Sequence, residues 1–214
     1  MNPKTDSETL FESFCTHHQL QWDPIPTDVT ARPDYKLTIG DIQIAVEIKQ
    51  LDTLSGFILG GRSSRTTGDH VRAAIKSAHS QIKWASRSDM PGLLLIYNAR
   101  DPWQAFGTEE HDFLDAMYGE RTVKISKGTG AHGPVFHGRN AKLRADDNVG
   151  FSGVGHLLRI QRRWPIITIY ENAHARYPLP FELLKPYFEV RRVMLERIDT
   201  RPRGSEVPNS GDVD

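Results

Sequence analysis

The chain has 214 residues, of which 38% are hydrophobic and 25% charged, and its 27 basic residues balance its 27 acidic ones. This length and composition suit one soluble globular domain and exclude collagen-like, coiled-coil and membrane-spanning classes, because no window approaches the ~18 apolar residues of a span. The only cysteine, Cys15, excludes an intramolecular disulfide and any zinc site with several thiolates, and we expect a cytoplasmic protein with no membrane partner.

The first predicted elements are a helix over residues 6–20 and a hairpin that follows a proline-punctuated connection over 22–33. Apolar side chains of the helix recur at three- and four-residue steps, which is the helical period. Two alternating runs, residues 35–39 and 42–49, flank a Gly-Asp dipeptide, so we expect two antiparallel strands joined by a tight turn.

A loop rich in Gly, Ser and Thr over residues 54–68 separates the hairpin from the best helix of the chain, residues 69–85. Apolar residues of this helix recur at three- and four-residue steps, which predicts one buried face: Val71, Ile75, Ala78, Ile82 and Ala85. The run at 93–97 is apolar on both faces, which is typical of a central strand covered on both sides.

The second half of the chain carries weaker patterns, and residues 128–155 are its most loop-like stretch. We expect one domain over residues 1–202 with a Gly-rich insertion around 106–160, and a disordered tail over 203–214. The order of the elements predicts an α/β fold in which helices flank a central mixed β-sheet. The remaining predicted elements are helices over 109–118, 155–162 and 180–188, and strands over 121–126, 166–170 and 190–195.

One group of charged residues is suited to chemistry: Asp34 at the head of the first predicted strand, with Glu47 and Lys49 on the second. Alternate side chains of a strand share a face, so Glu47 and Lys49 point to one side and their apolar neighbours to the other. The hairpin register brings Asp34 near Glu47, and two close carboxylates repel unless a cation lies between them. Oxygen ligands of this kind suit Mg²⁺ or Mn²⁺. Lys49 beside them would orient a water and stabilise a developing phosphorane charge.

This arrangement resembles the PD-(D/E)xK nuclease superfamily, whose members have the restriction-endonuclease-like fold. The match consists of a Pro-Asp pair ending at Asp34, a spacer of twelve residues, and Glu47-Ile48-Lys49 closing an apolar strand. The order of the surrounding elements also resembles that superfamily, and the likeness covers residues 6–97.

The resemblance implies that Asp34 and Glu47 bind the metal ion, Mg²⁺ or Mn²⁺, and that Lys49 serves the attacking water. It also implies a contribution from a glutamate of the first helix, for which we choose Glu8 because it flanks the apolar face. A residue of the later helix assists in some members of the superfamily. The candidates for that place are Gln81 and Lys76.

Basic residues in three places are candidates for contacts with nucleic acid. The loop at 60–65 combines glycines with two arginines, and the second helix carries two cations off its apolar stripe. A third, basic cluster precedes Trp164, which would stack on a base. The predicted contact residues are Arg62, Arg65, Arg72, Lys76, Arg162 and Arg163.

The sequence thus predicts a metal-dependent phosphodiesterase that hydrolyses nucleic acid, DNA more than RNA. Two alternatives stay open. One is a non-cleaving nucleic-acid-binding or assembly module on the same fold, and the other is an unrelated protein in which Glu47 and Lys49 form a solvated charged face of an ordinary hairpin. Because duplex cleavage needs two cuts, a homodimer is compatible with the interpretation, although the sequence does not show one.

Overall fold

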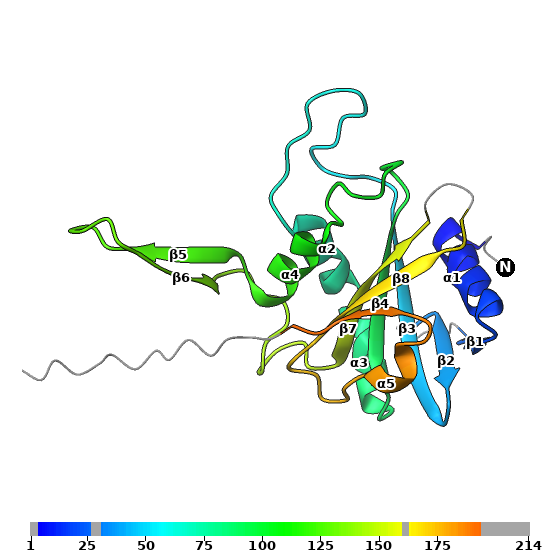
Figure 1. Ribbon diagram of the computed structural model, residues 1–214. Helices are drawn as coiled ribbons and strands as arrows, with labels where there is room; N and C mark the ends of the chain where they lie inside the picture. The colour runs from blue at the N-terminus through cyan, green and yellow to red at the C-terminus, as the bar shows by residue number, and fades with distance from the viewer. Residues whose placement is uncertain (1–3, 27–30, 160–162, 194–214) are drawn as a thin grey trace, which may run out of the picture.

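The computed structural model describes residues 4–26, 31–159 and 163–193, and its centre is a mixed sheet of seven strands (Figure 1). In their order across the sheet, the strands are β1 (Gln21–Pro24), β2 (Tyr35–Ile39), β3 (Ile42–Leu51), β4 (Gly92–Asn98), β7 (Phe151–Leu158), β8 (Ile166–Glu171) and β9 (Glu189–Arg191). The first three strands pair antiparallel, and β3, β4 and β7 pair parallel. β8 is antiparallel to β7, and β9 is parallel to β8.

Helices cover both faces of this sheet (Figure 1). The sheet separates two apolar clusters, one under each helix layer. The helices are α1 (Asp6–His17), α2 (Asp69–Ser77), α3 (His79–Arg87), α4 (Glu110–Tyr118) and the short α5 (Phe181–Leu184). α1 and α5 pack on the face to which Val46 and Ile48 of β3 point, while α2, α3 and α4 pack on the other. Because side chains of a strand alternate, Glu47 and Lys49 point toward the layer of α2, α3 and α4.

The predicted α/β class, with a mixed central sheet flanked by helices, is confirmed. The hairpin β2–β3 lies where the alternation predicts it, and the helix expected over 69–85 is two helices that meet at Ala78. The connection over 22–33 begins with most of the short edge strand β1, which its prolines concealed. The tail expected over 203–214, with the domain end before it, lies outside the described residues. Within the described ranges, no helix has the length and apolarity that a membrane crossing requires.

One central strand, β7, lies where the sequence predicts no strand. The pattern predicts a loop over 128–155 and a helix over 155–162, but residues 151–158 form β7, a strand between β4 and β8. Its glycines lie where neighbours approach closely, since a Cβ added at Gly155 would be 2.9 Å from Leu95 Cδ2. Glycine is uncommon inside strands, so the sequence pattern concealed a strand that packing requires to be small.

The region expected as an insertion, residues 106–160, contains α4, a separate hairpin and β7. The hairpin consists of β5 (Arg121–Ile125) and β6 (His132–His137), which form a two-stranded sheet of their own. In Figure 1 this hairpin projects away from the helices and the main sheet. Because β7 is a central strand, only the hairpin and its flanking loops are additions to the main sheet.

Candidate active site

Asp34 and Glu47 are cross-strand neighbours at the open end of the β2–β3 hairpin. The pairing of Tyr35 with Val46 sets a register in which the next pair is Asp34 and Glu47. Asp34 Oδ2 also accepts a 2.7 Å hydrogen bond from the backbone N–H of Ile48, which holds its carboxylate against β3. The structure therefore brings together the two carboxylates that the sequence predicts as metal ligands.

Lys49 completes this group from the same face of β3. Its Nζ lies 2.6 Å from Glu47 Oε1, in an ion pair whose lysine side chain is 27% exposed and whose glutamate side chain is 3% exposed. The second glutamate oxygen, Oε2, is buried and has no hydrogen-bond partner among the described residues. Leaving a buried carboxylate oxygen unpaired is unfavourable, so this oxygen is suited to bind a cation.

Burial raises the pKa of both carboxyl groups, and a nearby negative charge adds to the shift of each. The pKa of Glu47 rises to about 7, first because burial penalises the charged form and second because Asp34 is negative, while Lys49 opposes the shift. The pKa of Asp34 rises chiefly through burial and also through the charge of Glu8, against the hydrogen bond from Ile48 and the charge of Lys49. A divalent cation between the two carboxylates would favour their charged forms.

Glu8 contributes a third negative charge from α1, although its carboxylate also has a structural role. Its Oε2 accepts hydrogen bonds from Thr5 N at 2.6 Å and Thr5 Oγ1 at 2.8 Å, as part of the capping box that begins α1. Its charge raises the pKa of Asp34 and Tyr35, so it lies on the Asp34 side of the site. Glu12, the other glutamate of this helix, accepts a 2.8 Å hydrogen bond from the Tyr35 hydroxyl instead.

Gln81 lies on α3, the helix that packs against β3 and β4. Its Oε1 is buried without a hydrogen-bond partner in the described part of the chain. Trp84, which is three residues later and so near it on the helix surface, lies under the guanidinium of Arg32, 5.8 Å from the ring centre. Arg32 is two residues before Asp34, so this contact sets that side of α3 over the start of β2.

The carboxylate oxygens of Asp34 and Glu47 suit a hard divalent cation. Mg²⁺ prefers oxygen ligands, keeps several waters and is usually bound by one or two protein carboxylates together with substrate phosphates. Over the residues that the structure describes, no third His, Cys, Asp or Glu joins this pair to make a group with ligand atoms within 4.8 Å. The remaining coordination positions would therefore go to water and substrate.

Among the residues predicted to contact nucleic acid, Arg62 and Lys76 are exposed, whereas Arg72 is buried. The Arg72 guanidinium lies 2.9 Å from Asp69 Oδ1 and donates a 3.2 Å hydrogen bond to the backbone carbonyl of Asp115. The hydrogen bond to Asp115 joins α2 to α4. The structure therefore gives Arg72 a role in packing two helices, away from an open surface.

The basic cluster before β8 is only partly described. Arg162 lies outside the described residues, and Arg163 is exposed. Trp164, which the sequence interpretation assigns to a nucleic-acid base, stacks on the His17 ring at a centroid distance of 4.4 Å and an interplanar angle of 15°. One face of the indole is thus covered by α1.

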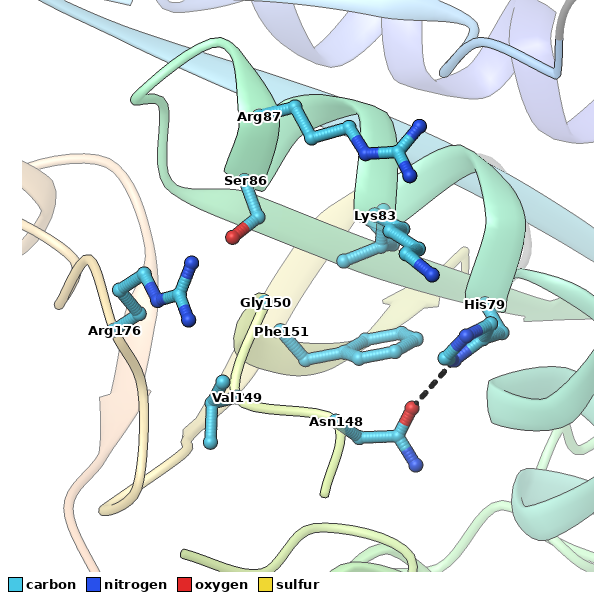
Figure 2. A pocket seen from close by; sticks show the side chains of 10 residues that line it. His79, Lys83, Ser86, Arg87, Asn148, Val149, Gly150, Phe151 and Arg176 are labelled. Carbon is cyan, nitrogen blue, oxygen red and sulfur yellow. Dashed lines mark hydrogen bonds between the residues drawn. The ribbon is translucent and has the colours of Figure 1, made fainter. Parts of the chain in front are cut away.

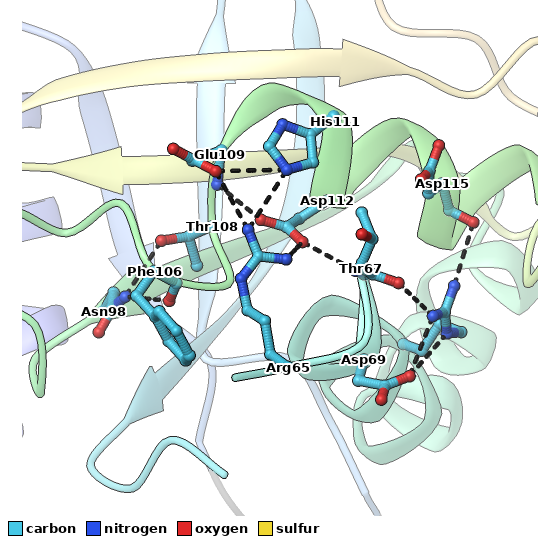
Figure 3. Close-up of polar contacts among 12 residues, drawn as sticks. Arg65, Thr67, Asp69, Asn98, Phe106, Thr108, Glu109, His111, Asp112 and Asp115 are labelled. Atoms are coloured by element: carbon cyan, nitrogen blue, oxygen red, sulfur yellow. Dashed lines mark hydrogen bonds and ion pairs between the residues drawn. The ribbon is translucent and has the colours of Figure 1, made fainter. Parts of the chain in front are cut away.

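A second group of ligating side chains lies at the start of α4 (Figure 3). Ligand atoms of Glu109, His111 and Asp112 all lie within 4.8 Å of one another, and such a group could hold a metal ion. The guanidinium of Arg65 lies among them: it is 3.1 Å from Glu109 Oε2 and 3.3 Å from His111 Nε2, and it pairs with Asp112 Oδ1. Asp112 Oδ1 also accepts a 2.8 Å hydrogen bond from Gly68 N. Arg65 thus supplies the positive charge here, and a metal ion would have to displace it.

A basic pocket of about 250 Å³ lies between α3 and the segment that leads into β7 (Figure 2). Lys83, Arg87 and Arg176 line it together with Phe151, and its lining includes neither a carboxylate nor any residue predicted for catalysis. This composition suits an anion with an apolar part. Lys83 and Arg87 are one helical turn apart, a spacing visible in the sequence, whereas nothing in the sequence brings Arg176 to them.

His156 is a further polar group that the sequence interpretation missed. Lys49 pairs with Ile96 and Ile96 with His156, so the three lie in one row across β3, β4 and β7. The imidazole Nε2 is buried and has no hydrogen-bond partner within the described ranges, and burial lowers the pKa of His156 to about 4. The ring is therefore neutral at pH 7. Its place could not be predicted because β7 itself was not.

Comparison of the chain with protein-family models, with curated proteins and with solved structures gives no match. The functional interpretation therefore depends on the residues and their geometry.

Proposed function

We propose that this protein is a nuclease that uses Mg²⁺ or Mn²⁺ to hydrolyse phosphodiester bonds of nucleic acid, with DNA preferred to RNA. The observation that carries the proposal is the convergence of Asp34, Glu47 and Lys49 at one end of the β2–β3 hairpin. A restriction-endonuclease-like fold is part of the same proposal. The chain order of helix, antiparallel hairpin, helices and a strand parallel to β3 supports it.

Each residue of the group has a distinct role in this proposal. Asp34 and Glu47 hold the metal ion, and a bound divalent cation supplies Lewis-acid activation of water and neutralises phosphate charge. Lys49 keeps its ammonium beside Glu47 and partly exposed, so it orients the attacking water and stabilises charge that develops on the phosphoryl oxygens. Glu8 adds charge beside Asp34, and Gln81 offers a buried amide oxygen without a partner in the described chain.

The Asp34→Asn variant tests the proposal. Wild-type protein should cleave plasmid and single-stranded DNA only when Mg²⁺ or Mn²⁺ is added. Asp34→Asn keeps the shape of the side chain but removes one ligand charge. We expect a loss of at least about 10- to 100-fold, since changing even an outer partner of a metal ligand costs this much. The matched control is Asp41→Asn, in the exposed turn of the same hairpin, which should leave the rate unchanged.

Two results would oppose this function in different ways. Cleavage that persists in EDTA, or that Asp34→Asn leaves intact, would contradict the assigned metal site. DNA binding by wild-type protein without cleavage in either metal would instead support the non-cleaving module on the same fold.

A further inference from the structure

The β5–β6 hairpin stands clear of the main sheet but is firmly attached at its base (Figure 1). Glu120 N donates to Arg139 O at 2.9 Å, and Gly138 N donates to Glu120 O at 2.8 Å. His137 Nδ1 also lies 2.8 Å from the carbonyl oxygen of Gly119, directly after α4. These bonds close the base of the hairpin. The backbone N–H groups of Lys142 and Leu143 then donate 2.9 Å hydrogen bonds to the α4 carbonyls of Ala116 and Met117, so the hairpin is a ribbon whose base is fixed to α4 and whose far end extends into solvent.

The charge of this ribbon differs from that of the whole chain. The hairpin together with the segment that follows it, residues 121–142, contains five Lys or Arg and no Asp or Glu, although the full sequence is neutral. Exposed apolar side chains accompany these cations, and Val135 is 63% exposed. The cations are Arg121, Lys124, Lys127, Arg139 and Lys142, and the exposed apolar residues are Val123, Ile125 and Val135.

We propose that the hairpin is an arm that binds duplex nucleic acid, with its two strands in a groove and its cations on the phosphates. The major groove of B-DNA admits a two-stranded β-ribbon. Lys and Arg side chains on phosphates supply most of the affinity in such complexes, while exposed apolar side chains can contact thymine methyl groups. The choice of partner follows from charge complementarity and depends on the proposed nuclease function.

The arm is attached on the side of the sheet that carries the candidate active site. α4, which ends at Tyr118, belongs to the helix layer toward which Glu47 and Lys49 point, and β5 begins at Arg121. Through α4 the arm is therefore attached to the helix layer on the face of the sheet that carries Glu47 and Lys49.

The Lys124→Gln/Lys127→Gln variant tests the arm. Both lysines are exposed on the hairpin. Binding of a short DNA duplex is measured by fluorescence anisotropy in EDTA at several salt concentrations, so that cleavage plays no part. We expect weaker binding, and the slope of log K against log salt should decrease by about two because each phosphate contact contributes about one.

The matched control is Lys185→Gln/Arg191→Gln, which removes the same net charge. Lys185 Nζ lies 2.7 Å from Glu182, and Arg191 lies 4.0 Å from Glu189, so these cations already have carboxylate partners on the body of the protein. This variant should bind DNA with the wild-type salt slope. If it weakens binding as much as the hairpin variant does, the effect is one of net charge and the arm is contradicted.

The outcomes separate the arm from the nuclease. Wild-type protein that binds through the hairpin but never cleaves would contradict the nuclease and support the arm. Cleavage together with an unchanged salt slope in the hairpin variant would overturn the arm alone.

Val135→Ser tests whether a second copy of the chain, and not nucleic acid, binds to the hairpin. If it converts a dimer to a monomer in sedimentation and leaves DNA affinity unchanged, the proposed partner is wrong.

Discussion

Replacing Glu47 by glutamine should abolish metal-dependent cleavage and, in the absence of metal, make the folded protein more stable at pH 8. The glutamate has an ordinary pKa of 4.5, and in the folded chain its pKa is about 7, mainly because of burial. Between these values the folded state binds a proton that the unfolded state has lost. The free energy of unfolding of the wild type therefore falls as the pH rises through this window.

The size of this effect is about 3 kcal/mol, because each pH unit over which the two states differ by one proton is worth about 1.4 kcal/mol. Glu47→Gln removes the titration, so its stability should match the wild type near pH 4 and exceed it at pH 8. Urea unfolding in EDTA across this pH range measures both proteins. If the free energy of unfolding depends on pH equally in the wild type and the variant, Glu47 does not titrate in this window. If the variant retains cleavage, Glu47 is not a metal ligand.

Replacing Lys49 by methionine should lower the cleavage rate by about 10²- to 10³-fold, the cost of removing one group that stabilises charge in the transition state. Methionine keeps an unbranched apolar chain but removes the ammonium that lies 2.6 Å from Glu47 Oε1. Because Lys49 lowers the pKa of Glu47, the variant should also need a higher pH for metal-supported activity. A pH profile of the cleavage rate in Mn²⁺ measures both changes.

The control for this variant is Lys36→Met on β2, where Lys36 pairs with Ala45 and not with Glu47. It should keep both the wild-type rate and the wild-type pH profile. If Lys49→Met changes thermal stability but neither the rate nor the profile, Lys49 is a structural partner of Glu47 and has no part in the reaction.

The sequence predicts the candidate site better than its surroundings because the site depends on short-range patterns. Alternation over β2 and β3 determines which face carries Glu47, and the tight turn between the strands determines the register that brings Asp34 opposite it. These relations involve residues adjacent in the sequence or across one hairpin.

The remaining features depend on contacts between distant parts of the chain. Arg65 looks like a free phosphate ligand in the sequence, but its partner Asp112 is 47 residues away and only the fold brings them together. β7 is concealed because packing against Leu95 requires glycine at position 155, and glycine weakens the strand pattern. His156 was missed with it.

The most direct test of the central claim is the binding of Mn²⁺, measured by isothermal titration and by electron paramagnetic resonance in three proteins. The claim is that Asp34 and Glu47 together hold the catalytic cation. Wild-type protein should bind Mn²⁺, Asp34→Asn should lose that binding, and His111→Ala, which removes a ligand from the Glu109 group, should retain it. Binding that survives Asp34→Asn and disappears in His111→Ala would place the cation at the start of α4 and contradict the claim.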